Sequence, residues 1–81
     1  MYIAVSNANG WARAETIQVA RSVAFQNSIV KDNRLRITVW ECKPEAWVNG
    51  HGEVFGVLGE GTEYKRTGKS WKRHVEVEAK D

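Results

Sequence analysis

The sequence predicts an α+β fold in which an antiparallel sheet of four to five strands carries one helix on one face. Three observations predict it: a segment with helical periodicity and no Gly or Pro, alternating apolar and polar residues further along, and Asn-Gly dipeptides between extended segments. We expect the order strand, helix, strand, strand, strand (β-α-β-β-β), in a single domain spanning residues 1–81. At 81 residues the core is modest, because such a chain buries only about 60% of its unfolded surface.

The N-terminal third predicts a strand followed by the helix. The β-prone residues 2–5 precede Asn9-Gly10, a dipeptide typical of a tight turn, so the chain starts with a strand or a hairpin. Residues 14–28 predict the helix, with Glu15 in its first turn at the positive end of the helix dipole. Phe25 lies at the edge of the apolar side and closes over the core. That side consists of Ile17, Val19, Ala20, Val23 and Ala24.

Residues 34–42 form the clearest strand. Leu35, Ile37 and Val39 alternate with polar residues and are expected to face the core. Trp40 falls on the opposite side, which is expected to face solvent and to contact a partner; the alternative is that this side is the core. Lys43-Pro44-Glu45 then interrupts the strand, because Pro cannot donate a ladder hydrogen bond.

The C-terminal half predicts the remaining strands. Asn49-Gly50 is the strongest turn signal, and residues 54–58 form the return strand. Gly59-Glu60-Gly61 predicts another turn. Residues 63–66 and 71–79 are expected as further strands on either side of Thr67-Gly68.

A basic segment at residues 64–74 (YKRTGKSWKRH) is the most informative part of the chain. It contains five Lys and Arg residues and no acidic residue, whereas the rest of the chain has 10 acidic and 7 basic residues. Such a separation of charge steers negatively charged partners, and Trp is enriched at interface hot spots. The predicted partner-binding residues are Arg34, Arg36, Trp40, Lys65, Arg66, Lys69, Trp71, Lys72 and Arg73.

Three interpretations of this segment stay open. Its cations would neutralise phosphates while Trp71 stacks on a base of single-stranded DNA or RNA. Alternatively, the charges solvate an edge strand while Trp71 anchors it to the core. In the third interpretation, the segment docks on an acidic protein surface, where electrostatic complementarity speeds the encounter.

Other functional classes lack support in the sequence. His51 and His74, with Glu53 and Cys42, do not have the spacing of a metal site, and no acid, base and nucleophile are placed for catalysis. We therefore expect no enzyme activity, no cofactor and no bound metal. The single cysteine suits a reducing cytoplasm, and no apolar run reaches the ~18 residues that a membrane-spanning helix needs.

Several spacings resemble those of small phage-encoded α/β proteins, including anti-CRISPR inhibitors of type I surveillance complexes. The residues that carry the resemblance are Ala20, Arg21, Ala24 and Gln26; Leu35, Ile37 and Val39; Gly52 to Val57; Tyr64-Lys65; and Gly68-Lys69-Ser70-Trp71. The resemblance implies a stoichiometric inhibitor without cofactor that occupies a nucleic-acid-binding surface on a large ribonucleoprotein. The segment 43–47 and the basic pair Lys72-Arg73 depart from that pattern.

The expected function is therefore a phage or mobile-element accessory protein that binds and inhibits a host macromolecular complex in the cytoplasm. The partner would be a host protein or ribonucleoprotein complex, with a CRISPR effector as the first candidate, and no membrane would be involved. The chain itself would be a monomer or a weak homodimer. Two alternatives remain: a nucleic-acid-binding module that uses the basic segment, and a small virion or assembly protein in which Trp47 packs between subunits.

Overall fold

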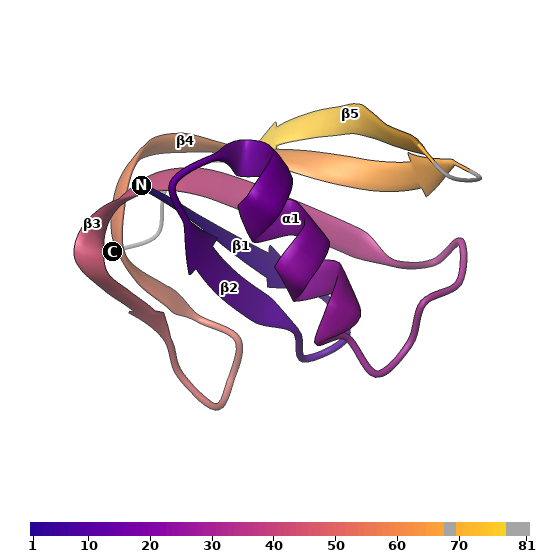
Figure 1. The fold of residues 1–81 in the computed structure, drawn as a ribbon, viewed down its shortest axis with the longest axis horizontal. Coiled ribbons are helices and arrows are strands. Elements are labelled where there is room, and N and C mark those ends of the chain that lie inside the picture. Colours follow the sequence, from indigo (N-terminus) through magenta and orange to yellow (C-terminus); the bar gives the residue numbers. More distant parts are fainter. Residues whose placement is uncertain (68–69, 78–81) are drawn as a thin grey trace.

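The computed structural model describes residues 1–67 and 70–77 and places one helix against one face of an antiparallel sheet (Figure 1). The five strands lie in the order β2-β1-β3-β4-β5, so β2 and β5 are the two edges. The predicted α+β class is confirmed. The elements are β1 (Tyr2–Ser6), β2 (Trp11–Ala14), α1 (Ile17–Gln26), β3 (Arg36–Val48), β4 (Val54–Thr67) and β5 (Ser70–Val77).

The structure has one more strand before the helix than the predicted order, because both β1 and β2 precede α1. The Asn9-Gly10 turn closes a hairpin in which β2 pairs with β1, and Asn9 adopts a φ of 62° there. The strand is only four residues long, and two of them are alanine, so its β-propensity is weak. The pairing with β1 therefore stabilises β2 despite its weak β-propensity.

The helix is shorter than the predicted range 14–28. Thr16 is its N-cap, and the Thr16 hydroxyl accepts a hydrogen bond from the Val19 amide at 3.2 Å. Glu15 precedes this cap, so its expected place in the first turn was wrong. Gly10 lets the helix approach the sheet, because a Cβ there would collide with the backbone carbonyl oxygen of Ala24 in the helix.

The helix contacts the sheet through small residues. Ala20 and Ala24 are fully buried, whereas Ile17, Val19 and Val23 are 36%, 51% and 37% exposed. The predicted apolar side was therefore right for the two alanines and wrong for the three larger side chains. Phe25 packs against the core on this side, as predicted. The small alanine side chains allow the helix to lie close to β1 and β2.

A second core lies on the face of the sheet that the helix leaves open. The helix-side core includes Leu35, Ile37 and Val39, as the alternation predicts. The helix-free face has its own buried cluster, formed by Ile3, Trp40, Cys42, Ala46, Val54 and Val57. Both faces of the central strands are therefore buried.

Two irregularities bend β3 and β4 so that they cover this second core. Residues 43–46 of β3 lie opposite the single residue Gly56. Gly56 adopts a φ of 84°, and a Cβ there would lie 3.0 Å from the Cα atom of Ala46. Pro44 lies in this bulge, as its missing amide hydrogen requires. Figure 1 shows β3 and β4 bending together toward the side of β1 and β2. The bulge is held there by the Arg13 guanidinium, which donates to the Pro44 carbonyl.

Trp40 is buried in this bend, so its predicted exposure was wrong. Only 6% of the residue is accessible, although the alternation places it on the predicted side, opposite Val39. The Gly59-Glu60-Gly61 segment does not form the predicted turn but lies within β4, at a register shift opposite Trp40. The alternation therefore assigned Trp40 to the correct face, and the bending of β3 and β4 explains why that face is buried.

Within the described ranges, no helix has the length and apolar character needed to cross a membrane.

Candidate binding surface on the helix-free face

Three cations lie side by side across three neighbouring strands. Arg36 of β3 is in register with Lys65 of β4, and Lys65 is in register with Lys72 of β5. Directly paired residues point to the same face, and neighbouring strands are about 4.8 Å apart. We call these three residues the cation row. Like charges placed opposite one another repel and destabilise a sheet. A negatively charged partner bound to the row would reduce this repulsion.

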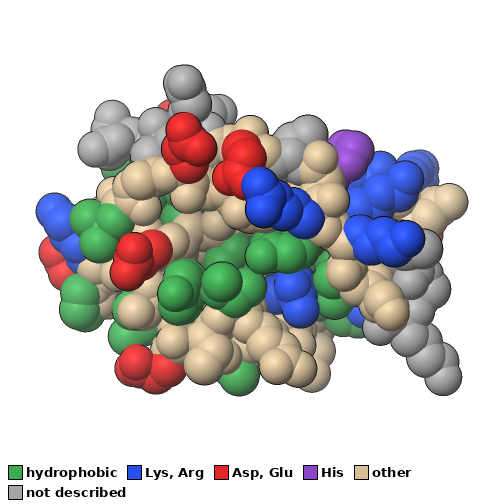
Figure 2. All heavy atoms as spheres, turned by 90° about the horizontal axis from the view of Figure 1, so that it is seen from above, with side chains coloured by type: hydrophobic (Ala, Val, Ile, Leu, Met, Phe, Trp, Pro, Cys, Tyr) green, Lys and Arg blue, Asp and Glu red, His purple; other side chains and the backbone are tan. Residues whose placement is uncertain are grey.

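The cation row lies on the helix-free face, because Ile37 and Tyr64, one position along, belong to the helix side. Lys65 and Lys72 are exposed. Neither lysine side chain has a hydrogen-bond or ion-pair partner among the described residues. Figure 2 shows Lys and Arg side chains gathered toward one end of the molecule, whereas Asp and Glu lie mainly toward the other.

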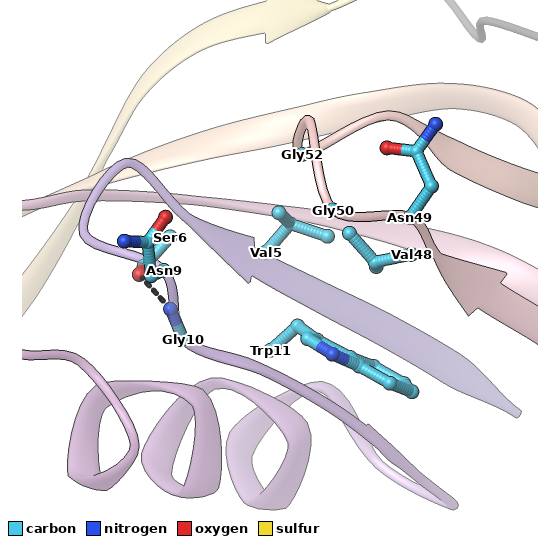
Figure 3. A pocket seen from close by; sticks show the side chains of 9 residues that line it. All are labelled: Val5, Ser6, Asn9, Gly10, Trp11, Val48, Asn49, Gly50 and Gly52. Carbon is cyan, nitrogen blue, oxygen red and sulfur yellow. Dashed lines mark hydrogen bonds between the residues drawn. The ribbon is translucent and has the colours of Figure 1, made fainter.

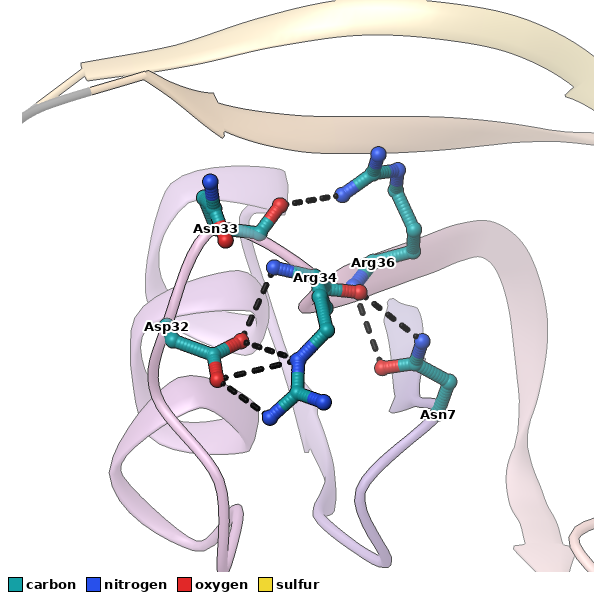
Figure 4. A network of polar contacts seen from close by, with 5 residues as sticks. All are labelled: Asn7, Asp32, Asn33, Arg34 and Arg36. Atoms are coloured by element: carbon teal, nitrogen blue, oxygen red, sulfur yellow. Dashed lines mark hydrogen bonds and ion pairs between the residues drawn. The ribbon is translucent and has the colours of Figure 1, made fainter.

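Arg34 does not contribute a free charge to this surface. Its guanidinium donates to both carboxylate oxygens of Asp32, with Nη2 at 2.7 Å and Nε at 3.1 Å from Oδ2 (Figure 4). These hydrogen bonds lower the pKa of the Asp32 carboxyl below its ordinary value and raise the pKa of the Arg34 guanidinium. Arg34 also lies before β3 and not within it, so this predicted contact residue forms a local ion pair.

Arg36 is held in place by the same loop. Its guanidinium donates to the carbonyl oxygens of Asn33 at 2.8 Å and of Leu35 at 3.0 Å. Its backbone amide donates to the Asn7 side chain at 3.1 Å, and the Asn7 side-chain amide donates to the Arg34 carbonyl (Figure 4). The charge at the inner end of the cation row is therefore fixed in position before a partner arrives.

Trp71 and Arg66 lie on the other side of the sheet, in an aromatic cluster under the helix. The Phe25 and Trp71 rings meet edge to face at a centroid distance of 5.8 Å. The Arg66 guanidinium lies 4.3 Å from the Phe25 centroid and 5.4 Å from that of Trp71. The Arg21 guanidinium lies 4.7 Å from the Tyr64 centroid and 5.7 Å from that of Trp71. Trp71 thus anchors β5 to the helix side, which agrees with the Trp71 part of the second interpretation.

The remaining predicted residues are also separated from the cation row. Arg73 is in register with Tyr64 on the helix side and forms an ion pair with Glu76. Lys69 lies outside the described residues. The nine predicted residues therefore do not form one surface: Arg36, Lys65 and Lys72 share the helix-free face, and Trp40 is buried beneath the bend.

A row of uncharged and acidic residues that the sequence analysis missed runs beside the cation row. Trp11, Val5, Thr38 and Glu63 are in register across β2, β1, β3 and β4. Two hollows lie along this row. One, of about 270 Å³, is bounded by Trp11 and the tip of the β3–β4 hairpin; the other, of about 180 Å³, reaches Arg36 and Glu63. Both are lined by Val5, Ser6 and Gly52, so they adjoin, and we call the two hollows together the groove.

The part of this groove that the sequence does signal is the pair of Asn-Gly turns at its rim. Asn9-Gly10 is followed at once by Trp11, and Asn49-Gly50 follows Val48. Each turn was recognised as a turn. Their meeting across the sheet depends on the bend of β3 and β4, which no local pattern encodes.

Comparisons with protein-family models, with curated proteins and with solved structures find no match for this chain.

Proposed function

We propose that this protein is a small non-enzymatic inhibitor that docks its helix-free face on a negatively charged surface of a host macromolecular complex. The observation that carries the proposal is the cation row, Arg36, Lys65 and Lys72, in which two lysines are exposed and the arginine is pre-positioned. Charged side chains arranged in this way raise the association rate and fix the orientation of a complex. Binding alone blocks the covered surface.

The resemblance to anti-CRISPR inhibitors supports a type I surveillance complex as the partner. Such a complex holds nucleic acid on its surface, and the inhibitor would occupy the site that its target DNA needs. The protein would then act in the cytoplasm of the host cell. The chain would act in a fixed ratio to the complex, without a cofactor.

The test is a competition between this protein and labelled target DNA for a purified type I surveillance complex. We expect the protein to displace the DNA stoichiometrically. Lys72→Glu is expected to weaken inhibition at least about tenfold, because it places a negative charge in the cation row. Its matched control is Lys43→Glu, which changes the net charge equally at an exposed position in the β3 bulge. Equal inhibition by the two variants would rule out the cation row as the contact.

A direct role in nucleic-acid binding is separated by a second measurement. Fluorescence anisotropy with labelled single-stranded and duplex DNA and RNA, at about 50 and 150 mM salt, reports the number of phosphates contacted. The proposal expects micromolar or tighter binding to be absent at the higher salt concentration. Strong binding that persists there would favour the nucleic-acid-binding module instead.

A further inference from the structure

The groove on the helix-free face ends in a pocket whose walls carry no charged side chain. Val5 and Val48 face one another across it, Trp11 lies along one side, and the two Asn-Gly turns stand at its rim (Figure 3). Its volume is about 270 Å³. An apolar cavity of about 150 Å³ accommodates benzene, so this pocket has room for a group of one or two rings.

Hydrogen bonds between side chains and the backbone stabilise both turns that border the pocket. The buried Ser6 hydroxyl accepts hydrogen bonds from the Gly10 amide at 2.9 Å and the Ala8 amide at 3.1 Å, and the Ser28 hydroxyl donates to it at 2.7 Å. The Asn49 side chain accepts from the amides of His51 and Glu53 and donates to the Glu53 carboxylate. The pocket is therefore formed before any ligand binds, which reduces the entropy lost on binding.

The same hydrogen bonds limit what the pocket can recognise. Ser6 and Asn49 already use their polar side-chain atoms within their own turns, so Asn9 and the Trp11 indole N–H are the side-chain groups of the lining that remain to pair with the polar edge of a nucleobase. A buried edge without partners is unfavourable. An apolar or aromatic side chain makes no such demand. An aromatic amino-acid side chain therefore needs fewer polar partners in this pocket than a base does.

Charge along the groove points to the same occupant. Glu63 lies in the row of Trp11, Val5 and Thr38, between the pocket and Lys65 along β4. A carboxylate there repels a continuous phosphate backbone. A protein surface, in contrast, can present separate acidic groups to the cation row while it places an uncharged group over the pocket.

We infer that the pocket between Trp11, Val5 and Val48 receives a single aromatic side chain from an acidic protein partner, whose carboxylates meet the cation row. This inference rests on the proposed function and identifies the anchor point of that interface. Anchors of this kind fill preformed pockets and dominate binding energy, while the charges around them set orientation.

The test uses N-acetylphenylalaninamide as a neutral probe, followed by two-dimensional ¹H–¹⁵N NMR of the whole chain. We expect saturable shifts at the Trp11 indole N–H and at the amides of Val5, Asn49 and Gly52, with a dissociation constant on the order of 1 mM. Trp11→Ala should weaken this binding about three- to tenfold, because it removes the aromatic wall. Trp47→Ala is the matched control, since Trp47 does not line the pocket.

Three outcomes would overturn the inference: no saturable shift at these groups, tighter binding of adenosine than of the probe, or equal effects of the two Trp variants. If Trp11→Ala fails to fold, Val48→Thr places a hydroxyl in the pocket at nearly constant shape and should weaken probe binding. Lys72→Glu separates the two proposals, because a neutral probe should bind that variant unchanged. Loss of inhibition by Lys72→Glu without any probe binding would reject the pocket and keep the proposed function.

Discussion

The indole of Trp40 lies directly against the backbone of Gly61. A Cβ added to Gly61 would fall 2.6 Å from the indole Cε2 atom, well inside van der Waals contact. The indole Nε1 is buried and has no hydrogen-bond partner among the described residues. Trp40 thus occupies space that only a glycine leaves open, and this contact lets β4 pass over the second core.

Gly61→Ala is expected to destabilise the protein by about 1–3 kcal/mol, because the added methyl group forces a rigid indole or the β4 backbone to move. Urea unfolding followed by circular dichroism measures the change. Gly50→Ala is the control, since a Cβ at Gly50 meets no atom within 4 Å. If both variants lost the same stability, the contact between Trp40 and Gly61 would not be the cause.

Ser6→Ala is expected to destabilise the protein by about 1–3 kcal/mol. Its hydroxyl accepts from the amides of Ala8 and Gly10, and these two buried donors would lose their partner, whereas the Ser28 hydroxyl would keep the Ala24 carbonyl. Ser22→Ala, on the exposed side of the helix, should be neutral or slightly stabilising because alanine favours helix. The free energy of unfolding in urea distinguishes the two, and a neutral Ser6→Ala would contradict the role given to this hydroxyl.

Trp71→Ala is expected to lower the free energy of unfolding by about 2 kcal/mol, because it removes the ring that contacts Phe25, Arg21 and Arg66. The loss is smaller than for a fully buried Trp because Trp71 is only partly buried. Trp47→Ala should have a smaller effect, because Trp47 is 51% exposed and its ring stacks on Phe55 at a centroid distance of 4.8 Å. Thermal unfolding midpoints compare the two variants. A stable Trp71→Ala protein would return Trp71 to the list of contact residues.

Cys42 is expected to react slowly with iodoacetamide in the folded protein. Burial raises the pKa of its thiol above the ordinary value of 9.0, so the reactive thiolate is scarce at pH 8. Because the folded-state pKa is raised, the associated stability is present below pH 9.0 and is lost as the pH rises through the folded-state pKa. Alkylation rates with and without denaturing urea check this, and equal rates would show that the thiol is accessible.

Local patterns predicted most of the fold. Alternation over Leu35, Ile37 and Val39 identified the helix-side core, and the absence of Gly and Pro identified the helix. The burial of Trp40 was not predictable in this way, because a second core forms only when β3 and β4 bend. Ile17 and Val23 remained exposed because helix periodicity states which residues share a side, not how closely that side approaches a sheet.

The binding surface was less predictable than the fold. The sequence grouped Lys65 to Arg73 because they are neighbours in the chain, but neighbours in a strand point to opposite faces. The structure instead joins Arg36 to Lys65 and Lys72 through register, although the first two are 29 positions apart in the sequence. Strand register depends on bulges and turns together, so a cluster in the sequence became two separate surfaces.

The bulge at residues 43–46 determines how far the β3–β4 hairpin reaches over β1, since these residues add length to one strand opposite Gly56 alone. The width of the pocket at the hairpin tip is thus set by a segment that contributes none of its lining. An insertion or deletion in this bulge would change which side chain fits while every wall residue stayed the same. Homologous chains could therefore acquire different partners through bulge length alone, before any contact residue is replaced.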